Sequence, residues 1–375
     1  MFIMPSRRGF TGATLAVLNM ALGLAKLKVR VYVVTTRPPR PYMEFLGRIQ
    51  ASGVKVYVFP RNPPSPLYWI YLWFKALAVA LKVKPSIIHP HLPKVSLISM
   101  FISKLLSIPM VFTLEGDPLY EVSTSRLLRK ALTYVAWWVA RKSSVAICPC
   151  SSWLASLVSH RHPEIKGKVY PVPNPVDYER FVKADPQGVR EELGVKGLMV
   201  FTAARLDKVK GVDVLVKAAS LLKKEGVKAT FIVAGEGPLR EELERIIREF
   251  GLIEEVKLVG FRGDVERLTA ACDVAVLPSI YEPFGMPAAE AGACGKPVVV
   301  SDVGGLREIV DDGVTGFVVP RGDYRALAKA IALLLSNQET RERLGRAARE
   351  KVMANFTPEK VALRLLKVYL RALRS

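Results

Sequence analysis

The stretch "DVAVLPSIYEPFGMPAAEAGACGKPVVVS", residues 273 to 301, decides the fold. It opens with a short apolar run, "DVAVLPS", which is typical of a buried strand, and it closes with a second such run, "KPVVVS". "IYEPFG" has the residues of a loop, and Pro287 suits the first helical turn because its missing N–H would be unpaired there. The stretch therefore predicts strand, loop, helix and strand, which is the repeating unit of a parallel α/β sheet.

Two acids stand eight positions apart in this unit, Glu282 and Glu290. In a parallel α/β unit the loop lies at the carboxyl edge of the sheet, where ligands bind, and the helix offers free N–H groups there. We expect Glu282 in the loop and Glu290 about one turn into the helix, both facing that crevice. A carboxylate can accept two hydrogen bonds from a vicinal diol of a ribose or hexose. Solvated surface acids are the alternative that this stretch alone leaves open.

The same alternation of apolar strands and helical segments runs through the chain. Strands are predicted at 29–35, 54–60, 86–91, 108–113 and 144–149, and, after a Pro-rich passage at 174–190, at 198–204, 229–235, 256–261, 273–279, 297–302 and 316–320. The predicted fold class is α/β, with two Rossmann-like doubly wound parallel sheets facing across a cleft. The predicted domains are 1–177 and 178–355, followed by a basic amphipathic helix at 356–375 that packs back on the first domain.

Positive charge is concentrated in the first half of the chain. The 375 residues are 24% charged and 50% hydrophobic, enough for two domains with substantial cores. The net charge is +21; residues 1–180 hold 24 Lys and Arg against 7 Asp and Glu (+17), and the rest hold 31 against 27 (+4). An anionic partner of the first half follows, and nucleic acid, an anionic membrane face and an acidic substrate are the candidates.

Location and cysteine use can also be read from the sequence. No apolar run approaches the ~20 residues that span a bilayer, and "MFIMPSRRG" lacks the apolar segment of a signal peptide, so a cytoplasmic protein is expected. Five Asn and three Gln fit a thermophile. The four cysteines form no C-x-x-C pair, which argues against zinc, and are expected to be buried small hydrophobes: Cys148, Cys150, Cys272 and Cys294.

Cations and glycines follow several strands of the second half. Arg205 and Lys210 precede a helix that should begin near Gly211, and two cations beside a helix N-terminus suit a diphosphate. A solvated pair of loop cations is the alternative. Two further turns allow a backbone to approach a ligand in the same crevice, although a plain strand-to-helix turn explains the first of them as well; they contain Gly235 and Gly237, and Gly304 and Gly305.

Cations for a diphosphate, with acids for sugars on each side of it, describe a nucleotide-sugar site. The motifs, in order, resemble those of family 4 retaining glycosyltransferases of the GT-B fold: Arg205, "KG" at 210–211, "GEGP" at 235–238, the E-x7-E of Glu282 and Glu290, and "VGG" at 303–305. "NPVDYERF" at 174–181 resembles the linker motif of the family. The resemblance covers nearly the whole chain.

The resemblance implies roles for individual residues. Those matching Arg205 and Lys210 hold the diphosphate and, with Glu282, are the predicted catalytic set; the one matching Glu290 binds the nucleotide ribose. The match to Glu282, with the backbone around Phe284 and Gly285, meets the transferred sugar. Gly12 of "GFTGATL" matches a glycine of the first loop, near the phosphates and the acceptor.

The chain departs from the family pattern at three places. Glu115, in "FTLEGDP", stands where the family usually has His, and His91, in "HPH", matches a common His. Both are candidate acceptor or sugar contacts, with a buried or capping role as the alternative for His91. Ala204 replaces a usual Gly, and the first strand, within "MFIMP", is shorter than that of the family, which leaves open whether the start lies further upstream.

The resemblance implies retention of anomeric configuration with no metal and no cofactor, and the sequence has no D-x-D motif with an evident role in clamping a diphosphate through Mg²⁺. Our preferred mechanism is front-face attack, in which the leaving phosphate oxygen takes the proton of the acceptor and the cations stabilise that oxygen.

The basic first half should then hold the acceptor. Segments 65–84 and 126–144 mix Trp, Tyr and Phe with Lys and Arg, as in helices that lie in a bilayer interface. A lipid or lipid-linked acceptor, an anionic membrane surface and a peripheral location at the inner face of the cell membrane are the expected partners and place. The alternative is that Trp69, Trp73, Trp137 and Trp138 belong to the core.

Three other functions were weighed. A soluble-acceptor enzyme of the glycogen- or sucrose-synthase kind is the nearest alternative. A basic nucleic-acid-binding protein is a distant one, because no helix-turn-helix, zinc or RNP motif occurs. An NAD-dependent oxidoreductase would need a fuller glycine fingerprint than either half supplies.

Overall fold

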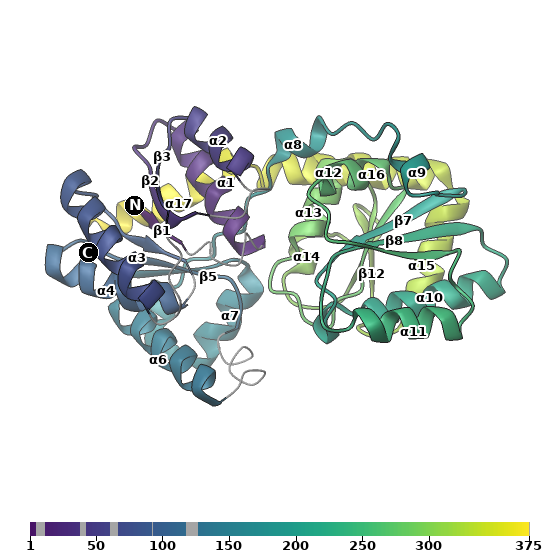
Figure 1. The fold of residues 1–375 in the computed structure, drawn as a ribbon, viewed down its shortest axis with the longest axis horizontal. Helices are drawn as coiled ribbons and strands as arrows, with labels where there is room; N and C mark the ends of the chain where they lie inside the picture. Colours follow the sequence, from purple (N-terminus) through teal and green to yellow (C-terminus); the bar gives the residue numbers. More distant parts are fainter. Residues whose placement is uncertain (5–11, 38–42, 61–66, 92, 118–126, 375) are drawn as a thin grey trace. The chain divides into compact units, whose positions relative to one another are not determined.

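The computed structural model describes residues 1–4, 12–37, 43–60, 67–91, 93–117 and 127–374 (Figure 1). The chain divides into two compact units. Unit 1 consists of Met1–Pro175 and Pro358–Ser375, and unit 2 consists of Val176–Thr357. Each unit is described by itself.

The strands of unit 1 are all parallel. Four of them form a sheet in the order β3-β2-β1-β4: β1 (Phe2–Ile3), β2 (Tyr32–Thr36), β3 (Lys55–Phe59) and β4 (His89–Pro90). β5 (Val111–Leu114) pairs with β6 (Ala146–Pro149), and single bridges from Ile88 to Met110 and from His91 to Thr113 connect β4 with β5. The strands therefore follow the order 3-2-1-4-5-6 of a doubly wound fold.

Helices cover both faces of these strands. α1 (Gly12–Lys26), α2 (Met43–Ala51) and α17 (Pro358–Ala372) contribute to one apolar core, and α3 (Leu67–Val83) and α4 (Pro93–Leu106) to another. In Figure 1, α3, α4 and α6 (Leu127–Ser143) lie on one side of the strands and α1 and α2 on the other. α7 (Ser152–Arg161) and a 3₁₀ helix (Pro163–Lys168) complete the unit. α17 crosses α1 closely, because a Cβ on Gly23 would lie 2.0 Å from the Pro358 oxygen.

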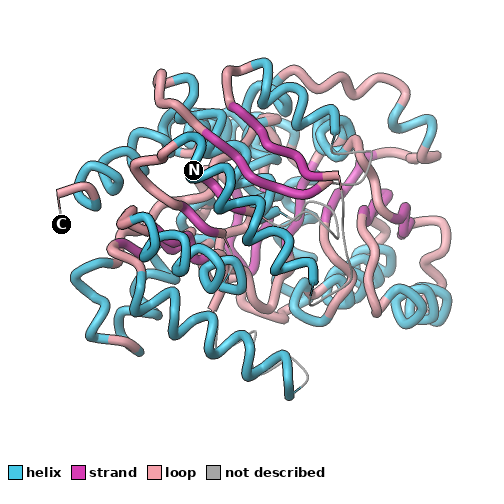
Figure 2. Tube along the Cα trace, turned by 60° about the vertical axis from the view of Figure 1, so that its left-hand side comes forward, coloured by secondary structure: helices cyan, strands magenta, loops and turns pink. Residues whose placement is uncertain are grey.

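Unit 2 is a six-stranded parallel sheet in the order β12-β11-β10-β7-β8-β9. Its strands are β7 (Leu198–Ala203), β8 (Ala229–Ala234), β9 (Val256–Gly260), β10 (Val274–Leu277), β11 (Val298–Ser301) and β12 (Gly316–Val319). All six residues of β8 are buried, because helices cover both faces of a parallel sheet and leave an uninterrupted apolar run. Figure 2 colours the helices cyan and the strands magenta.

The described helices of unit 2 precede the first strand of the sheet, connect consecutive strands or follow the last strand. They are α8 (Tyr178–Val182), α9 (Val189–Glu192), η3 (Lys208–Lys210), α10 (Val212–Lys224), α11 (Arg240–Glu249), α12 (Val265–Ala271), α13 (Met286–Ala293), α14 (Leu306–Ile309), α15 (Tyr324–Ser336) and α16 (Gln338–Asn355). α13 has a proline in its first turn, which confirms the prediction for Pro287, and its N-cap is Gly285.

The cysteines and some of the aromatic residues of α3 and α6 are buried. All four cysteines are buried, which confirms that they act as small apolar residues, and burial raises the pKa of Cys148 to about 12. Among the described residues, no helix is both long and apolar enough to cross a bilayer. Trp137 is 2% exposed and Trp69 and Trp73 pack against the α3–α4 core, as the alternative of core tryptophans predicts, whereas Phe74 (58%) and Trp138 (48%) are exposed. Contact of these helices with a bilayer stays a prediction.

Candidate functional site

The predicted donor residues of unit 2 gather where its strand order reverses. β7 and β10 are neighbours in the sheet although two strands separate them in sequence. Arg205 follows β7, Lys210 ends η3 directly before α10, and Glu282 lies in the loop after β10. The carboxyl ends of such neighbouring strands form the ligand crevice of doubly wound sheets.

The cations are held by acids in this structure. The Lys210 Nζ donates to Glu282 Oε2 at 2.8 Å, and the Ser279 hydroxyl donates to the same oxygen at 3.2 Å. Glu282 is only 8% exposed. Arg205 pairs with Asp207 two residues on, and its own side chain is 72% exposed. Lys210 and Glu282 are thus in contact with each other. Arg205 lies in the same loop as Lys210, but its side chain is exposed.

The glycines at Gly235 and Gly237 are required by packing between loops. A Cβ on Gly235 would lie 1.9 Å from the Ala204 carbonyl oxygen, and one on Gly237 would lie 2.3 Å from that of Leu206. Gly235 also has a φ of 144°, which other residues rarely adopt. The Leu206 N–H donates to the Glu236 carbonyl at 3.0 Å. The loop after β8 therefore lies directly against the loop that carries Arg205 and fixes its backbone.

The second glycine pair supports Glu282 in the same way. A Cβ on Gly304 would lie 1.9 Å from the Glu282 carbonyl oxygen, and the Gly305 N–H donates to that oxygen at 3.1 Å. Gly285 takes a φ of 106° at the N-cap of α13. Phe284 is buried, with its ring 5.7 Å from that of Phe356. Backbone contacts thus position the loops before the side chains meet any ligand.

The loops after β7 and β10 are joined as well. The Ile280 N–H donates to the Val209 carbonyl at 2.8 Å, and Gly211, at φ 63°, passes so close to Pro278 that a Cβ would lie 2.0 Å from its oxygen. The loops after β7, β8, β10 and β11, which we call the rim, therefore form a set of backbone turns in contact with one another, and they carry Lys210 and Glu282. Such preorganisation is what electrostatic stabilisation of a reacting group requires.

Glu290 lies within α13 and is half-buried. Burial raises the pKa of Glu290 to about 7; Arg180 opposes this rise, and the nearby Glu266 and Asp177 add to it. Its electrostatic neighbours lie on or beside α8 and α12. Glu290 and Glu282 therefore have different surroundings, one carboxylate paired with a lysine and the other half-buried near further acids.

Unit 1 brings His91 and Glu115 together at the carboxyl ends of β4 and β5. The His91 Nδ1 lies 3.5 Å from Glu115 Oε1, and the Asn174 amide donates to Glu115 Oε2 at 2.7 Å. His91 is 2% exposed, and neither ring nitrogen has a hydrogen-bond partner among the described residues. Glu115 Oε1 and Asn174 Oδ1 also lack one there. Burial lowers the pKa of His91, against the influence of Glu115, so the ring is neutral.

A second histidine belongs to the framework below this cluster. His89 contacts the hydroxyls of Tyr369 and Thr113, each at 2.6 Å, and its ring stacks on that of His91 at 5.1 Å. These contacts satisfy both nitrogens of His89, whereas neither nitrogen of His91 has a hydrogen-bond partner among the residues that the structure describes. Gly12 is exposed and is the first residue of α1, and residues 5–11 before it lie outside the described residues.

Several participants were missed by the sequence analysis. Asp207 and Ser279 stand two and three residues from predicted site residues, so a check of the polar neighbours in each loop could have found them. Asn174 lies within the quoted linker motif, but its contact with Glu115 spans 59 residues and has no local signal. Among the described residues, no group of three or more acids, histidines or cysteines could hold a metal ion.

Comparison with known proteins agrees with this geometry. Residues 189–351 match the family model described as glycosyl transferases group 1, and residues 10–180 match that of glycosyltransferase family 4. Together the two models cover both units. The chain belongs to the family 4 glycosyltransferases, and it is an enzyme that transfers sugars.

Relatives and solved structures place the protein more closely. It is 29% identical over 309 residues to a glycogen synthase of Mycobacterium tuberculosis, covering 81% of this chain and 73% of the relative. An uncharacterized glycosyltransferase of Methanocaldococcus jannaschii is 27% identical over 365 residues, with 94% and 92% covered. The crystal structure of Anabaena HepE in complex with UDP and glucose superposes with a TM-score of 0.82 at 23% identity, covering 99% of this chain and 98% of that one. The fold is therefore GT-B.

Proposed function

We propose that this protein is a retaining glycosyltransferase that moves a sugar from a nucleoside-diphosphate sugar to a lipid-linked acceptor at an anionic, cytosolic membrane face. The observation that carries the acceptor side is the division of charge. Unit 1 holds 28 Lys and Arg against 6 Asp and Glu, a net +22, whereas unit 2 holds 27 against 28, a net −1. The whole positive excess of the chain belongs to one unit.

The donor side rests on the Lys210–Glu282 pair. Each side chain neutralises the other across 2.8 Å, so neither is left as an unpaired charge in a half-buried crevice. A bound diphosphate attracts Lys210, and Glu282 is then free to accept hydrogen bonds from hydroxyls of the sugar. Binding of the donor thus breaks the ion pair between Lys210 and Glu282 and gives each of these side chains a contact with the donor instead. Arg205, exposed beside the same crevice, supplies a second cation to the diphosphate.

The chemical step needs no nucleophilic side chain. The acceptor hydroxyl attacks the anomeric carbon on the face from which the diphosphate departs, and its proton passes to the leaving phosphate oxygen. The bond from the anomeric carbon to that oxygen breaks as the bond to the acceptor forms. Lys210 and Arg205 stabilise the negative charge that grows on the diphosphate, a contribution of several kcal/mol in comparable sites. This route retains the anomeric configuration.

Glu290 and the unit 1 cluster complete the proposed contacts. Glu290 accepts from ribose hydroxyls, the role that its family match implies, and loses its proton when it does so. Within the part of the chain that the structure describes, His91, Glu115 and Asn174 each have a buried polar atom without a hydrogen-bond partner. Buried polar atoms without partners carry a desolvation cost that a hydroxyl-bearing ligand removes. We assign them to hydroxyls of the transferred sugar or the acceptor.

An apolar and basic face of unit 1 supports the membrane assignment. Three neighbouring helices expose large apolar side chains on their outer sides, at 48% to 64% exposure: Phe74 and Leu81 of α3, Phe101 and Leu105 of α4, and Tyr134 and Trp138 of α6. Exposed lysines accompany them, namely Lys82, Lys84, Lys104 and Lys142. We call these ten residues the apolar-basic face. Apolar burial and attraction to anionic lipid act together on such a surface.

Sedimentation with liposomes tests the membrane part. The protein should sediment with vesicles of phosphatidylglycerol and phosphatidylcholine, less with phosphatidylcholine alone, and less at high salt, because salt screens charge. Replacing Phe74, Phe101 and Trp138 by Ser should abolish the binding. The matched control replaces three similarly exposed apolar residues of unit 2, Phe250, Ile253 and Phe261, and should change nothing. Equal loss in both variants would contradict the assignment to unit 1.

Donor and stereochemistry are tested separately from the membrane. A thermal-shift screen with UDP-, GDP- and ADP-sugars should identify one donor that stabilises the protein by mass action. Nuclear magnetic resonance of the product then reports the anomeric configuration, and an inverted product would rule out the front-face route.

A soluble acceptor is the second candidate. The names of two similar proteins favour it, the mycobacterial glycogen synthase and, among the structures, a sucrose-phosphate synthase of Thermosynechococcus elongatus that superposes with a TM-score of 0.77 at 21% identity. This candidate predicts full activity on water-soluble sugars without lipid or detergent, together with no sedimentation on anionic vesicles.

A further inference from the structure

Glu115 is an exception among the described acids of unit 1. The unit holds 28 Lys and Arg against 6 Asp and Glu, so cations are abundant around its few carboxylates. Asp117, Glu164 and Glu359 each pair with an arginine or a lysine. Glu115 has no Lys or Arg partner among the residues that the structure describes. Its carboxylate is therefore one whose counter-charge must come from elsewhere.

The Glu115 side chain is nevertheless only 9% exposed. The Asn174 amide donates to its Oε2 at 2.7 Å, and no described residue donates to its Oε1. His91 lies 3.5 Å from Oε1, but burial lowers the pKa of His91, so its ring is neutral and does not balance the charge. A buried carboxylate without a cation is costly, and such groups are normally paired.

His91, Glu115 and Asn174, the unit 1 cluster, present more acceptors than donors. Within the described part of the chain, Glu115 Oε1, Asn174 Oδ1 and both nitrogens of His91 lack hydrogen-bond partners. The two oxygens can only accept, and a neutral imidazole offers one acceptor nitrogen and one N–H. The cluster thus combines three acceptors and one donor with one negative charge. A hydroxyl brings one hydrogen and no charge, whereas a protonated primary amine brings three hydrogens and a positive charge, which matches the cluster in both respects.

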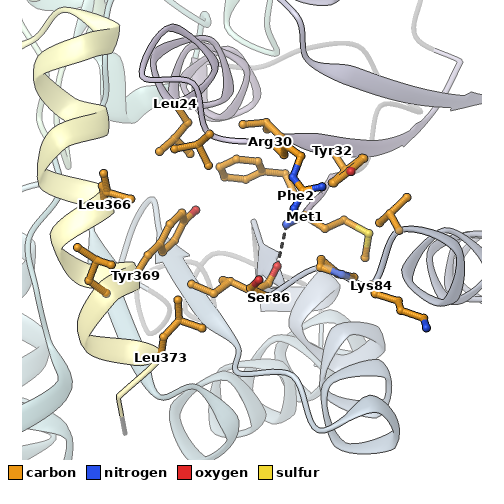
Figure 3. Close-up of a pocket in the computed structure, with 16 residues that line it drawn as sticks. Met1, Phe2, Leu24, Arg30, Tyr32, Lys84, Ser86, Leu366, Tyr369 and Leu373 are labelled. Carbon is orange, nitrogen blue, oxygen red and sulfur yellow. Dashed lines mark hydrogen bonds between the residues drawn. The ribbon is translucent and has the colours of Figure 1, made fainter.

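A pocket elsewhere in unit 1 has the opposite character. It measures about 290 Å³ and lies at the starts of β2 and β4, where Leu366, Tyr369 and Leu373 of α17 form one wall (Figure 3). The rest of its lining is mostly apolar but includes Arg30 and Lys84, and the lining residues that the structure describes include no acid. A cation is disfavoured there. Of these two places in unit 1, the cluster is the one that suits a cation.

We propose that the unit 1 cluster is a subsite for a protonated amino group, and that the sugar which unit 1 contacts is an amino sugar with a free amine. This inference rests on the proposed function, because that function supplies the sugar. The amine takes the place of one sugar hydroxyl at the cluster, and the N–H of His91 donates to the oxygen of a neighbouring hydroxyl. The amine can belong to the transferred sugar or to the acceptor.

Glu115 is then a specificity-determining residue. Its carboxylate favours an amine over a hydroxyl, and it disfavours the carboxylate of a uronic acid through repulsion between like charges. The positive excess of unit 1 does not cancel this preference. Exposed charges farther away than a Debye length of ~8 Å are largely screened by salt, whereas a buried pair in contact is not.

Matched substrates test the proposal. The donors are a neutral hexose on the nucleoside diphosphate that the thermal-shift screen selects, its amino derivatives with the amine at each hydroxyl position in turn, and their N-acetyl forms. The acceptors are octyl glycosides of the same sugars. One amino derivative should have a kcat/KM about tenfold above that of the hexose, and its N-acetyl form should lose this advantage because it carries no charge. The series that shows the preference identifies which substrate carries the amine.

Two variants connect the preference to the cluster. Glu115→Gln should bring the ratio of kcat/KM for the amino sugar to that for the hexose close to one. Glu164→Gln, the control, should keep the ratio, since Glu164 is 46% exposed and pairs with Arg141. Each ratio compares two substrates on the same folded variant, so a loss of stability does not change it. No preference for an amine in either series, or an unchanged ratio in Glu115→Gln, would overturn the proposal.

Failure of this inference is distinct from failure of the proposed function. Transfer of neutral hexoses with no preference for an amine would overturn the subsite alone. Absence of transfer from every nucleotide sugar would contradict the proposed function. Ligand-observed nuclear magnetic resonance with free glucosamine and glucose then tests the subsite by itself. Tighter binding of glucosamine that Glu115→Gln abolishes would support the subsite, and equal binding of the two sugars would overturn it.

Discussion

The two units have the same strand order but differ in how their candidate ligand-binding side chains are paired. In unit 2, backbone turns after β7, β8, β10 and β11 interlock, and the predicted charges are paired, as Lys210 is with Glu282. In unit 1, His91 and Glu115 leave buried polar atoms without partners among the described residues. Unit 2 is nearly neutral, whereas unit 1 has a large positive excess. This contrast motivates the proposal that unit 2 supplies the catalytic charges and that unit 1 contacts the acceptor or the transferred sugar.

Removing Lys210 is the strongest test of this division. Lys210→Met should lower kcat by about 10²- to 10³-fold, as loss of one donor that stabilises a growing negative charge does elsewhere. Lys210→Arg, which keeps a cation, should retain most activity. Single-turnover kinetics with a nucleotide sugar would measure the chemical step.

Lys217→Met provides the control. Lys217 lies on the neighbouring helix α10 and pairs with Asp213 at 3.3 Å on the surface. It should have unchanged kinetics. If Lys210→Met loses no more activity than Lys217→Met, the catalytic charge does not lie in the crevice after β7.

A single added methyl group at Gly304 should displace the loop that carries Glu282. Gly304→Ala introduces a Cβ 1.9 Å from the Glu282 carbonyl, whereas Gly313→Ala has a similar φ, 73° against 58°, and open space around it. Both variants carry the strain of a left-handed residue, about 1 kcal/mol. Gly304→Ala should cost about 1 to 3 kcal/mol more through overpacking.

Activity separates this effect from stability. Displacement of the Glu282 loop should lower kcat/KM by up to about 100-fold in Gly304→Ala, because catalytic geometry is sensitive to shifts of ~1 Å. Gly313→Ala should unfold at a slightly lower temperature and keep its kinetics. Similar kcat/KM values in the two folded variants would show that the rim need not be rigid.

These contrasts also show how far the sequence could lead. Parallel strands buried on both faces leave continuous apolar runs, so β7 to β12 could be located from residues 198–320 alone. The strand-to-loop positions of Arg205, Lys210 and Glu282 followed from those runs. The pairing of Lys210 with Glu282 spans 72 residues and depends on the meeting of strand ends, which no local pattern reports.

The tryptophans of α6 have different surroundings for a geometric reason. Adjacent residues on a helix point ~100° apart, so Trp137 and Trp138 point in different directions. One is buried against the unit and the other is exposed. Composition counts both alike, and only the phase of the helix against its neighbours separates them.

The recognition role of unit 1 can be tested at Glu115. Glu115→Gln keeps the shape but removes the charge beside His91, and it should lower kcat/KM by about tenfold, the size expected when a charged hydrogen bond to a ligand is lost. The affinity for the free nucleotide should not change, because the nucleotide is assigned to unit 2. Glu164→Gln is the control, since Glu164 is 46% exposed and pairs with Arg141. A weaker nucleotide affinity in Glu115→Gln would contradict the division between the units.

Replacing Glu290 should have the smallest effect, and it should change stability and nucleotide affinity in opposite directions. Burial raises the pKa of Glu290 to about 7, above its value in the unfolded chain, so the folded state binds the extra proton. The stabilisation that this proton brings is complete below pH ~4.5 and is lost as the pH rises through about 7. Glu290→Gln, which cannot ionise, should therefore unfold a few degrees higher than the natural protein at pH 8 and at nearly the same temperature at pH 5. Nucleotide binding should move the other way, because a carboxylate accepts ribose hydroxyls better than an amide: the variant should bind about tenfold more weakly at pH 8. Unfolding temperatures across this pH range measure the gain in stability, and nucleotide titrations measure the loss of affinity. A variant that gains stability without losing affinity would show that Glu290 does not bind the ribose.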